Sequence, residues 1–184
     1  ESSTISFGNT TLTSADNMRL KVDIFVAKVT PSGAWEWALS AGGTDSDLGY
    51  GISALADGSS VVTGYFESST ISFENTTLTS AGQSVIFVAE ATESCARARP
   101  VAARGTSGDF GYGISALVDG SSVVTGSFHD TASFGDITLT SAGAYDIFVA
   151  KVTPSGAWEW ALSAGGTLDD YGYGISALAD GSSV

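Results

Sequence analysis

Apolar and polar residues alternate along much of this chain with the two-residue period of β-strands, most clearly in the stretch GYGISALADGSSVVTG from Gly49 to Gly64. Two runs rich in apolar, β-branched and aromatic residues are separated there by Asp57-Gly58. An Asp-Gly pair between two such runs predicts a tight β-hairpin, because Gly accepts the positive φ that the turn requires. Both arms carry little charge, so we expect this hairpin to be sandwiched between other sheets.

The hairpin pattern recurs at a fixed spacing. It returns from Gly111 to Gly126 and again from Gly172 to Val184. A second motif, IFVA, starts at Ile24, Ile86 and Ile147, which gives spacings of 62 and 61 residues. A fixed period of this length indicates a repeat architecture.

Each period contains four strand-length runs and one small extra hairpin. In the middle copy the first three runs read GISALA, SVVTGYF and VIFVAEAT, and the fourth takes the place of AWEWALSA in the outer copies. The small hairpin reads ISFGNTTLTS from Ile5 to Ser14, with counterparts starting at Ile71 and Ala132. Its short alternating arms around a Gly or Asn turn predict a surface hairpin.

The fourth run carries two tryptophans at alternate positions. A period of two places Trp35, Trp37 and Leu39 on one face of the strand and the residues between them on the other. We expect the tryptophan face to pack and the other face, Glu36, Ala38 and Ser40, to meet solvent. Packing between sheets is one interpretation of the tryptophans, and a platform on which sugars stack is the alternative.

The middle repeat departs from the pattern over the segment Glu90 to Arg104. The outer copies read KVTPSGAWEWALSAGGT, whereas the middle copy reads EATESCARARPVAARGT at the same length. Arg97 and Arg99 stand in place of the tryptophans, and Pro100 removes a backbone donor. An abrupt change at constant length suggests a stretch read out of frame. We expect this segment to be the weakest part of the fold.

Composition narrows the class of protein. The 184 residues are 43% hydrophobic and include 23 glycines but only 3 prolines, which suits a compact all-β protein. A net charge of −13 argues against nucleic acid and anionic membrane surfaces as partners. The sequence has no apolar run of about 18 residues, so we expect no membrane insertion. Cys95 is the single cysteine, which excludes an intramolecular disulfide.

The repeats contain several recognisable motifs: G-Y-G-I-x-A, D-G-x-x-V-V-T-G-x-F, F-G-x-x-x-L-T, D-I-F-V-A-K-V-x-P-S-G and W-A-L-S-A-G-G-T. Together these motifs resemble the seven-bladed β-propeller repeat (SBBP) family, and the hairpin is similar to that of NHL-type propellers. The resemblance implies β-propeller blades, each a four-stranded antiparallel sheet with GISALA innermost and AWEWALSA outermost. It implies an extracellular or cell-surface protein and carries no catalytic signature.

About three repeats fall short of the four to eight blades of closed propellers, so we expect an incomplete or open propeller. Residues 1–49 form a partial blade with its surface hairpin, and residues 50–111 a blade containing the aberrant segment 90–104. Residues 112–172 form another blade, and residues 173–184 start a further one. Blade faces left open favour further blades of the same chain, or self-association, as partners.

The acidic loop before each GYG motif is the candidate site. Hard cations such as calcium take several oxygen ligands at once, which carboxylates in a Gly-rich loop can supply. The alternative is that each Asp caps its own loop by accepting backbone hydrogen bonds. Calcium is thus a possible ligand, and the sequence suggests no other cofactor. The candidate residues are Asp45, Asp47, Asp109, Asp169 and Asp170.

The sequence favours a non-enzymatic module. His129 is the single histidine and is expected in a solvated loop after a strand. No nucleophile, base and orienting group occur together, so we expect no catalytic residues. The function that the repeats predict is a structural or protein-interaction region of a larger protein. The alternative is a module that binds a carbohydrate or calcium through the loops between its strands, and the identity of any protein or glycan ligand stays open.

Overall fold

The computed structural model describes residues 4–14, 21–73, 76–80, 82–93 and 100–184. These residues form strands and turns, without helix, so the predicted all-β class is confirmed. Nothing in the described ranges has the form of a long apolar helix able to cross a membrane.

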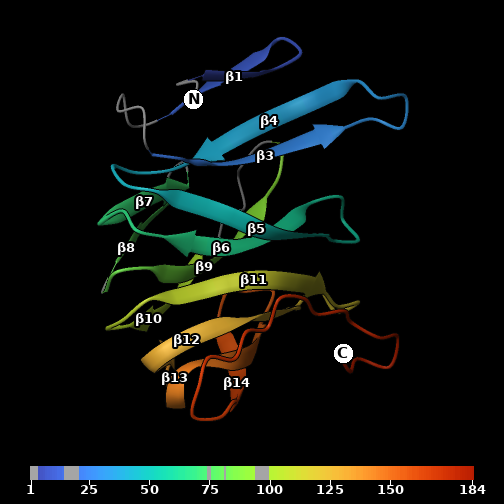
Figure 1. The fold of residues 1–184 in the computed structure, drawn as a ribbon. Helices are drawn as coiled ribbons and strands as arrows, with labels where there is room; N and C mark the ends of the chain where they lie inside the picture. The colour runs from blue at the N-terminus through green and yellow to red at the C-terminus, as the bar shows by residue number, and fades with distance from the viewer. Residues whose placement is uncertain (1–3, 15–20, 74–75, 81, 94–99) are drawn as a thin grey trace.

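The strands follow one another in short antiparallel pairs from the N-terminus onward (Figure 1). The first half contains β1 (Thr4–Phe7), β2 (Thr10–Thr13), β3 (Ile24–Val29), β4 (Trp35–Ala41), β5 (Asp47–Ala54), β6 (Ser60–Phe66), β7 (Thr70–Phe73) and β8 (Thr76–Thr79). The second half contains β9 (Val85–Ala91), β10 (Val101–Gly105), β11 (Asp109–Ala116), β12 (Ser122–Phe134), β13 (Ile137–Val152) and β14 (Trp158–Ala164).

Two four-stranded ladders make up the main sheet. In the first ladder β5 pairs with β6, β6 with β9, and β9 with β10, all antiparallel. In the second ladder β11, β12, β13 and β14 pair in the same order. The tight turn predicted at Asp57-Gly58 is present, with Gly58 at a φ of 87°. Each ladder therefore contains the four runs that the sequence predicts for one period.

The ladders are joined, whereas the sequence predicts two separate sheets. Arg104 pairs with Ser133 and Gly105 with Ala132, which links β10 to β12 and makes one curled eight-stranded antiparallel sheet. The link exists because β12 does not stop at the expected strand end. It is 13 residues long and includes the first arm of the small hairpin.

Each small hairpin packs on the third strand of its repeat, which is β3, β9 or β13. The first is β1–β2 and the second is β7–β8, while the third forms the ends of β12 and β13 around Gly135. Each hairpin directs one phenylalanine onto a phenylalanine of the strand below: Phe7 on Phe25, Phe73 on Phe87 and Phe134 on Phe148, at ring distances of 5.2, 5.3 and 5.0 Å. The hairpins are thus packed on one side rather than wholly exposed.

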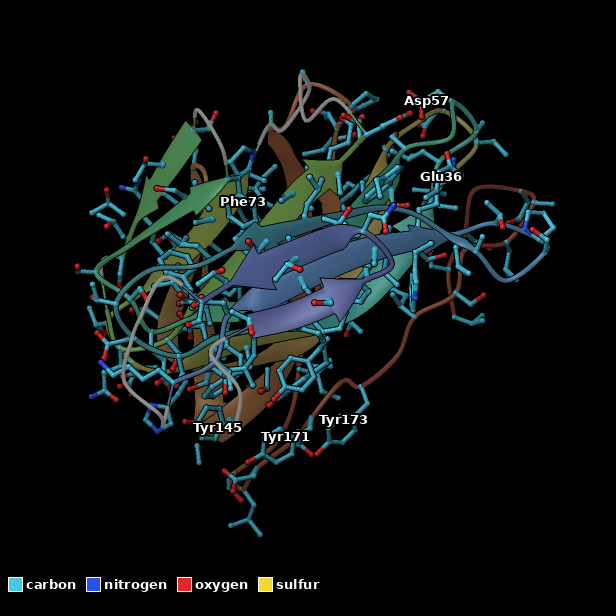
Figure 2. All side chains as sticks on the ribbon, turned by 90° about the horizontal axis from the view of Figure 1, so that it is seen from above. Glu36, Asp57, Phe73, Tyr145, Tyr171 and Tyr173 are labelled. Atoms are coloured by element: carbon cyan, nitrogen blue, oxygen red, sulfur yellow. The ribbon has the colours of Figure 1, made fainter. Side chains whose placement is uncertain are left out.

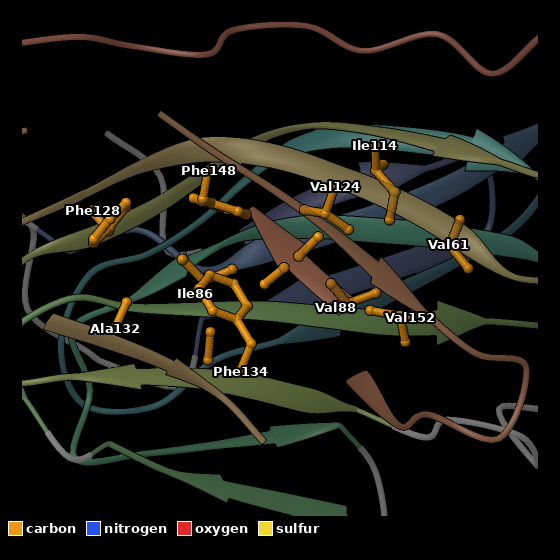
Figure 3. Packing of buried hydrophobic residues seen from close by; sticks show 13 residues of the cluster. Val61, Ile86, Val88, Ile114, Val124, Phe128, Ala132, Phe134, Phe148 and Val152 are labelled. Carbon is orange, nitrogen blue, oxygen red and sulfur yellow. The ribbon is translucent and has the colours of Figure 1, made fainter. Parts of the chain in front are cut away.

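The core consists of two apolar clusters. One is centred on the second ladder and includes Phe128, Phe134 and Phe148, all fully buried (Figure 3). The other lies between the first ladder and β3, and includes Ile24, Phe66 and Phe87. The expected sandwiching of the hairpins holds for Val61 and Val124, which belong to the first of these clusters, but it is wrong for the inner strand β5, where Tyr50 and Ile52 are exposed.

The expected faces of the tryptophan strands are wrong in part. Ala38 and Ala161, expected to meet solvent, are buried, while Leu162 on the tryptophan face is 65% exposed. The small alanines fit close against the neighbouring core. Trp35 is 49% exposed, and it packs edge-on against Phe7 of the small hairpin at 5.0 Å rather than into the space between sheets.

The aberrant segment keeps the pairing of the repeat where it is described. Ala102 lies opposite Phe87 and Ala103 opposite Ile86, as Ser163 lies opposite Phe148 and Ala164 opposite Ile147. Strand β10 starts directly after Pro100, where the missing N–H does not interrupt the ladder. Cys95, Arg97 and Arg99 lie outside the described residues.

Candidate functional site

The predicted acidic residues lie just before the three GYG motifs, and two of them, Asp47 and Asp109, are the first residues of β5 and β11. Asp47 is fully buried and accepts hydrogen bonds from the Gly43 amide and the Ser68 hydroxyl, both at 2.8 Å. Asp170 accepts from the Gly166 amide at 2.8 Å. These two carboxylates close the loop that precedes each inner strand, as the capping interpretation of the sequence predicts.

Two further candidates face other partners. Asp45 forms an ion pair with Lys21 at 2.7 Å, and its own amide donates to Ser68 Oγ. Asp169 accepts from the Tyr145 amide at 3.3 Å. Within the described ranges, the structure brings together no group of three or more His, Cys, Asp or Glu side chains with the geometry of a metal site.

Asp109 occupies the same repeat position but has a different environment. It is fully buried, and the amide of His129 approaches its Oδ1 at 3.4 Å. Among the described residues its Oδ2 has no hydrogen-bond partner, because the strand containing Gly105 does not present an amide as Gly43 and Gly166 do. Burial raises the pKa of Asp109 to about 7.

His129 lies within β12 and not in the loop that the sequence predicts. Its Nδ1 is 3.1 Å from Oδ2 of Asp130, and its ring is 5.2 Å from that of Tyr145. Ser107 also donates to Oδ2 of Asp130, at 2.8 Å. The pairing of β12 with β13 shifts between His129 and Thr131, and Asp130 adopts a φ of 61° at that irregularity. Strand pairing on both sides of this irregularity explains why His129 belongs to the sheet.

Aromatic rings form a continuous surface that was not among the sites predicted from the sequence. We name it the aromatic strip; its residues are Tyr50, Tyr65, Phe110, Tyr112, Tyr145, Tyr171 and Tyr173. Ring centroids of its neighbours are 4.7 to 6.2 Å apart. Figure 2 shows Tyr145, Tyr171 and Tyr173 in a row along one edge of the molecule.

The repeat itself builds this strip. Tyr50, Tyr112 and Tyr173 are the tyrosines of the three GYG motifs, and strand pairing shifts by one residue next to the first two. Tyr112 contacts Tyr50 on one side and Tyr173 on the other, at 5.5 and 5.3 Å. The recurring GYG motif was the sequence signal that could have indicated this strip, but the tyrosine rings come together only because the repeats stack.

Three phenol groups of the strip have a raised pKa. Burial is the largest cause that raises the pKa of Tyr65, Tyr112 and Tyr145. Tyr50 and Tyr173 remain 52% and 70% exposed. The strip therefore offers flat apolar faces together with hydroxyl groups, a combination suited to ring stacking and hydrogen bonding.

A groove of about 470 Å³ lies at the turn ends of the inner hairpins, between the turns of two repeats. Asp57 and Asp119 line it, but each carboxylate already accepts hydrogen bonds within its own turn, from Ser59 and from Ser121. Pro154 and Val118 contribute apolar surface. The groove forms where three turns lie close together, those of Asp57, of Asp119 and of Pro154.

No protein-family model matches this chain, and no curated protein matches its sequence. The assignment of a function therefore depends on the internal geometry.

Proposed function

We propose that the chain is a non-enzymatic region of β-propeller blades that serves as a structural or protein-interaction module of a larger protein, outside the cell or at its surface. In this proposal each four-stranded ladder is one blade. β5 and β11 are innermost, and β10 and β14 outermost. The proposal joins the resemblance of the motifs to the geometry of the repeats.

One observation carries the proposal: successive inner strands stack through the same contact. The Ala116 amide donates to Ser53 Oγ at 3.0 Å, and the Ala177 amide donates to Ser115 Oγ at 3.0 Å. The two bonds join residues 63 and 62 positions apart, about one repeat. A contact that recurs with the period of the sequence is expected where blades surround a common axis.

The polar cluster near His129 favours a role without catalysis. Ser107 donates to Asp130 and not to His129, so the histidine is not placed as a base for that hydroxyl. Asp47 and Asp170 already accept backbone amides, which favours the capping role over calcium binding.

The blade architecture is tested by lengthening the chain with further copies of residues 112–172 until seven repeats are present. We expect a closed ring in a crystal structure, with equivalent Ser-to-Ala bonds between all inner strands. An open superhelix or a flat sheet would overturn the proposal.

Carbohydrate binding is the second candidate, and the aromatic strip is the observation that favours it. Sugar rings stack on exposed aromatic faces, and phenols can hydrogen-bond their hydroxyl groups. A glycan array should be probed with the wild-type chain, with Tyr173→Ala and with Trp35→Ala, which removes an exposed ring outside the strip. Binding lost only in Tyr173→Ala supports this function, and equal binding by all three proteins rejects it.

A further inference from the structure

The tip of the first small hairpin carries an exposed asparagine. Strand β1 ends at Phe7 and β2 begins at Thr10, so the loop between them consists of Gly8 and Asn9. Gly8 has a φ of 60°, and a glycine at the first loop position is typical of the two-residue II′ turn. Asn9 takes the second position and is exposed. A loop tip of this kind is open to solvent and tolerates additions to the chain.

The residues that follow Asn9 give this tip a chemical meaning. Asn9-Thr10-Thr11 matches Asn-x-Ser/Thr, the acceptor sequence for N-linked glycans. Thr11 lies opposite Ser6, which is next to the buried Phe7, and the alternation of the strands therefore places the Ser6 and Thr11 hydroxyls on the outward face. Oγ1 of Thr11 is 2.9 Å from Oγ of Ser6, in an exposed pair. The side-chain amide and the hydroxyl of the acceptor sequence are thus both on the solvent side.

The exposure of this tip is a property of the repeat. The third small hairpin, well inside the sequence, has the same two-residue loop, Gly135-Asp136. Gly135 has a φ of 62°, and both residues of that loop are exposed. Ser133 and Thr138 form the same exposed pair of hydroxyls, at 3.2 Å. Asn9 is therefore accessible for the same reason as Asp136, whatever precedes it in the chain.

The turn itself does not require an asparagine. Asp136 takes the same loop position, and the strand pairing beside it is the same as beside Asn9. An aspartate cannot accept an N-linked glycan, because the glycan is attached to the side-chain amide of asparagine. Asn9 thus supplies an amide that its turn does not need. The sequence repeats the acceptor triplet at Asn75-Thr76-Thr77, where Asn75 lies outside the described residues.

We propose that Asn9 is an acceptor site for an N-linked glycan. The donor is an oligosaccharide joined through a pyrophosphate to a membrane lipid. A bond forms between Nδ2 of Asn9 and C1 of the first sugar, while the bond from C1 to the pyrophosphate oxygen breaks. The amide nitrogen loses one proton, the lipid pyrophosphate leaves, and nothing is oxidised or reduced. The inference rests on the extracellular or cell-surface location in the proposed function, since acceptor sequences of this kind are used in secreted proteins.

The test uses the whole chain, exported from a eukaryotic cell line behind a cleavable leader that supplies the compartment. Asn75→Gln serves as the background, because it leaves Asn9 as the one acceptor triplet of the sequence. We expect this chain to run above the 18.6 kDa of the bare chain, and an amidase that removes N-linked glycans should abolish the shift. The amidase converts a glycosylated asparagine to aspartate, and peptide mass spectrometry should find that conversion at Asn9.

Thr11→Val and Thr11→Ser form the matched pair of variants in the same background. Valine keeps the β-branched shape of threonine but removes its hydroxyl, whereas serine keeps the hydroxyl that the acceptor sequence requires. We expect the amidase-sensitive shift to be lost in Thr11→Val and kept in Thr11→Ser. Asn9→Gln, which removes the acceptor amide, should lose the shift completely.

Asp136→Asn is the converse variant, in which a site should be gained. It is made in a chain that already carries Asn9→Gln and Asn75→Gln. The substitution creates the triplet Asn-Ile-Thr at the equivalent tip of the third hairpin. Because this loop has the same geometry as that of Asn9, we expect one glycan to be attached there.

Three results would overturn the inference: an Asn75→Gln chain without the shift, an amidase-sensitive shift that persists in Asn9→Gln, or Thr11→Val modified as fully as Thr11→Ser. Exported and cell-retained chains are both measured, so poor export does not hide the result. Circular dichroism before and after the amidase should show the same strand content, and a glycan present only on unfolded chain would also overturn the inference. An absent glycan would leave the proposed blades standing, since the lengthened chain tests those separately.

Discussion

The two four-stranded ladders have the same plan but differ in their outermost strand. Strand β14 covers seven residues and pairs with β13 from Ala164 to Trp158, whereas β10 covers five and pairs with β9 over three positions. The register is nevertheless the same. Ala103 is fully buried in β10, whereas its equivalent in β14, Ala164, is exposed. The described part of β10 therefore keeps the register of the repeat without the tryptophans.

The ladders also differ where the outer strand ends and the loop returns to the next inner strand. After β4 and β14, the loop amides of Gly43 and Gly166 meet the carboxylates of Asp47 and Asp170. After β10, Gly105 pairs with β12 instead, and the carboxyl of Asp109 loses that partner. A change in one strand has therefore altered the electrostatics of the following repeat.

Truncation of equivalent core phenylalanines should show the largest difference in unfolding free energy between the two ladders. Phe148 and Phe87 are both fully buried, and truncation of such a ring costs about 3–5 kcal/mol. We expect Phe148→Ala to lose more than Phe87→Ala. Phe148 supports Phe134, which itself packs on Trp158 at 5.0 Å, and this support extends to the outer strand. Urea unfolding monitored by circular dichroism measures both losses, and an equal or reversed order would show that the outer strand adds nothing to this site.

Asp109→Asn should stabilise the protein at alkaline pH. The folded pKa of about 7 lies above the ordinary value of 3.8, so between these values the folded state holds a proton that the unfolded state has released. The free energy of unfolding therefore falls as pH rises through this window. Removing the charge should recover about 2–4 kcal/mol at pH 8, an upper range for a shift of this size.

The pH dependence provides the check on that variant. Urea unfolding of wild type between pH 4 and 8 should show the decline, and Asp109→Asn should flatten it. Asp170→Asn is the control, because it replaces a carboxylate that accepts a hydrogen bond from the Gly166 amide at 2.8 Å. This variant should lower the free energy of unfolding by about 1 kcal/mol. If the free energy of unfolding of the wild type does not change with pH in this window, the raised pKa of the buried Asp109 carboxyl is contradicted.

The sequence predicts the strands and their order because both follow from local patterns. Asp57-Gly58 specifies a turn, and the recurrence of IFVA specifies the period. The sequence did not predict that Arg104 and Gly105 would pair with β12, since that depends on how far a strand continues. It also missed that the tyrosines of three GYG motifs meet, because rings more than 60 residues apart come together only through stacking.

Among the candidate site residues, the local part of the prediction describes the geometry of Asp47 and Asp170. Each accepts an amide four residues away, an arrangement set by the loop itself. The burial of Asp109 depends on elements of the neighbouring repeat and was beyond reach. So was the position of His129, because a strand that passes through an irregularity at Asp130 reads locally like a strand followed by a loop.

Restoring residues 90–104 to the sequence of residues 28–42 should lengthen β10 and stabilise the first ladder. The tryptophans would be restored on a partly exposed strand, so we expect the free energy of unfolding to rise by about 1–2 kcal/mol, less than for a fully buried aromatic side chain. For a chain of this size that corresponds to a rise of roughly 2–8 °C in Tm. Hydrogen exchange should show new protection in β10 approaching that of β14. Unchanged exchange and Tm would mean that the present segment stabilises the first ladder as well as the repeat sequence does.

Trp158→Phe should have the smallest effect. Nε1 of Trp158 donates to the Ala102 carbonyl at 3.3 Å, which ties β14 to β10 of the other ladder. Phenylalanine keeps an aromatic ring against Phe134 but removes this donor, at a cost of about 0.5–1.5 kcal/mol. Trp35→Phe is the matched control, because Trp35 packs on Phe7 in the same edge-on way, at 5.0 Å. The difference between the two losses in urea unfolding isolates the hydrogen bond from the change in ring size. Since β10 is the strand that lacks tryptophans of its own, a larger loss in Trp158→Phe would show that the intact ladder supports the altered one, and equal losses would show that the two outer strands are energetically independent.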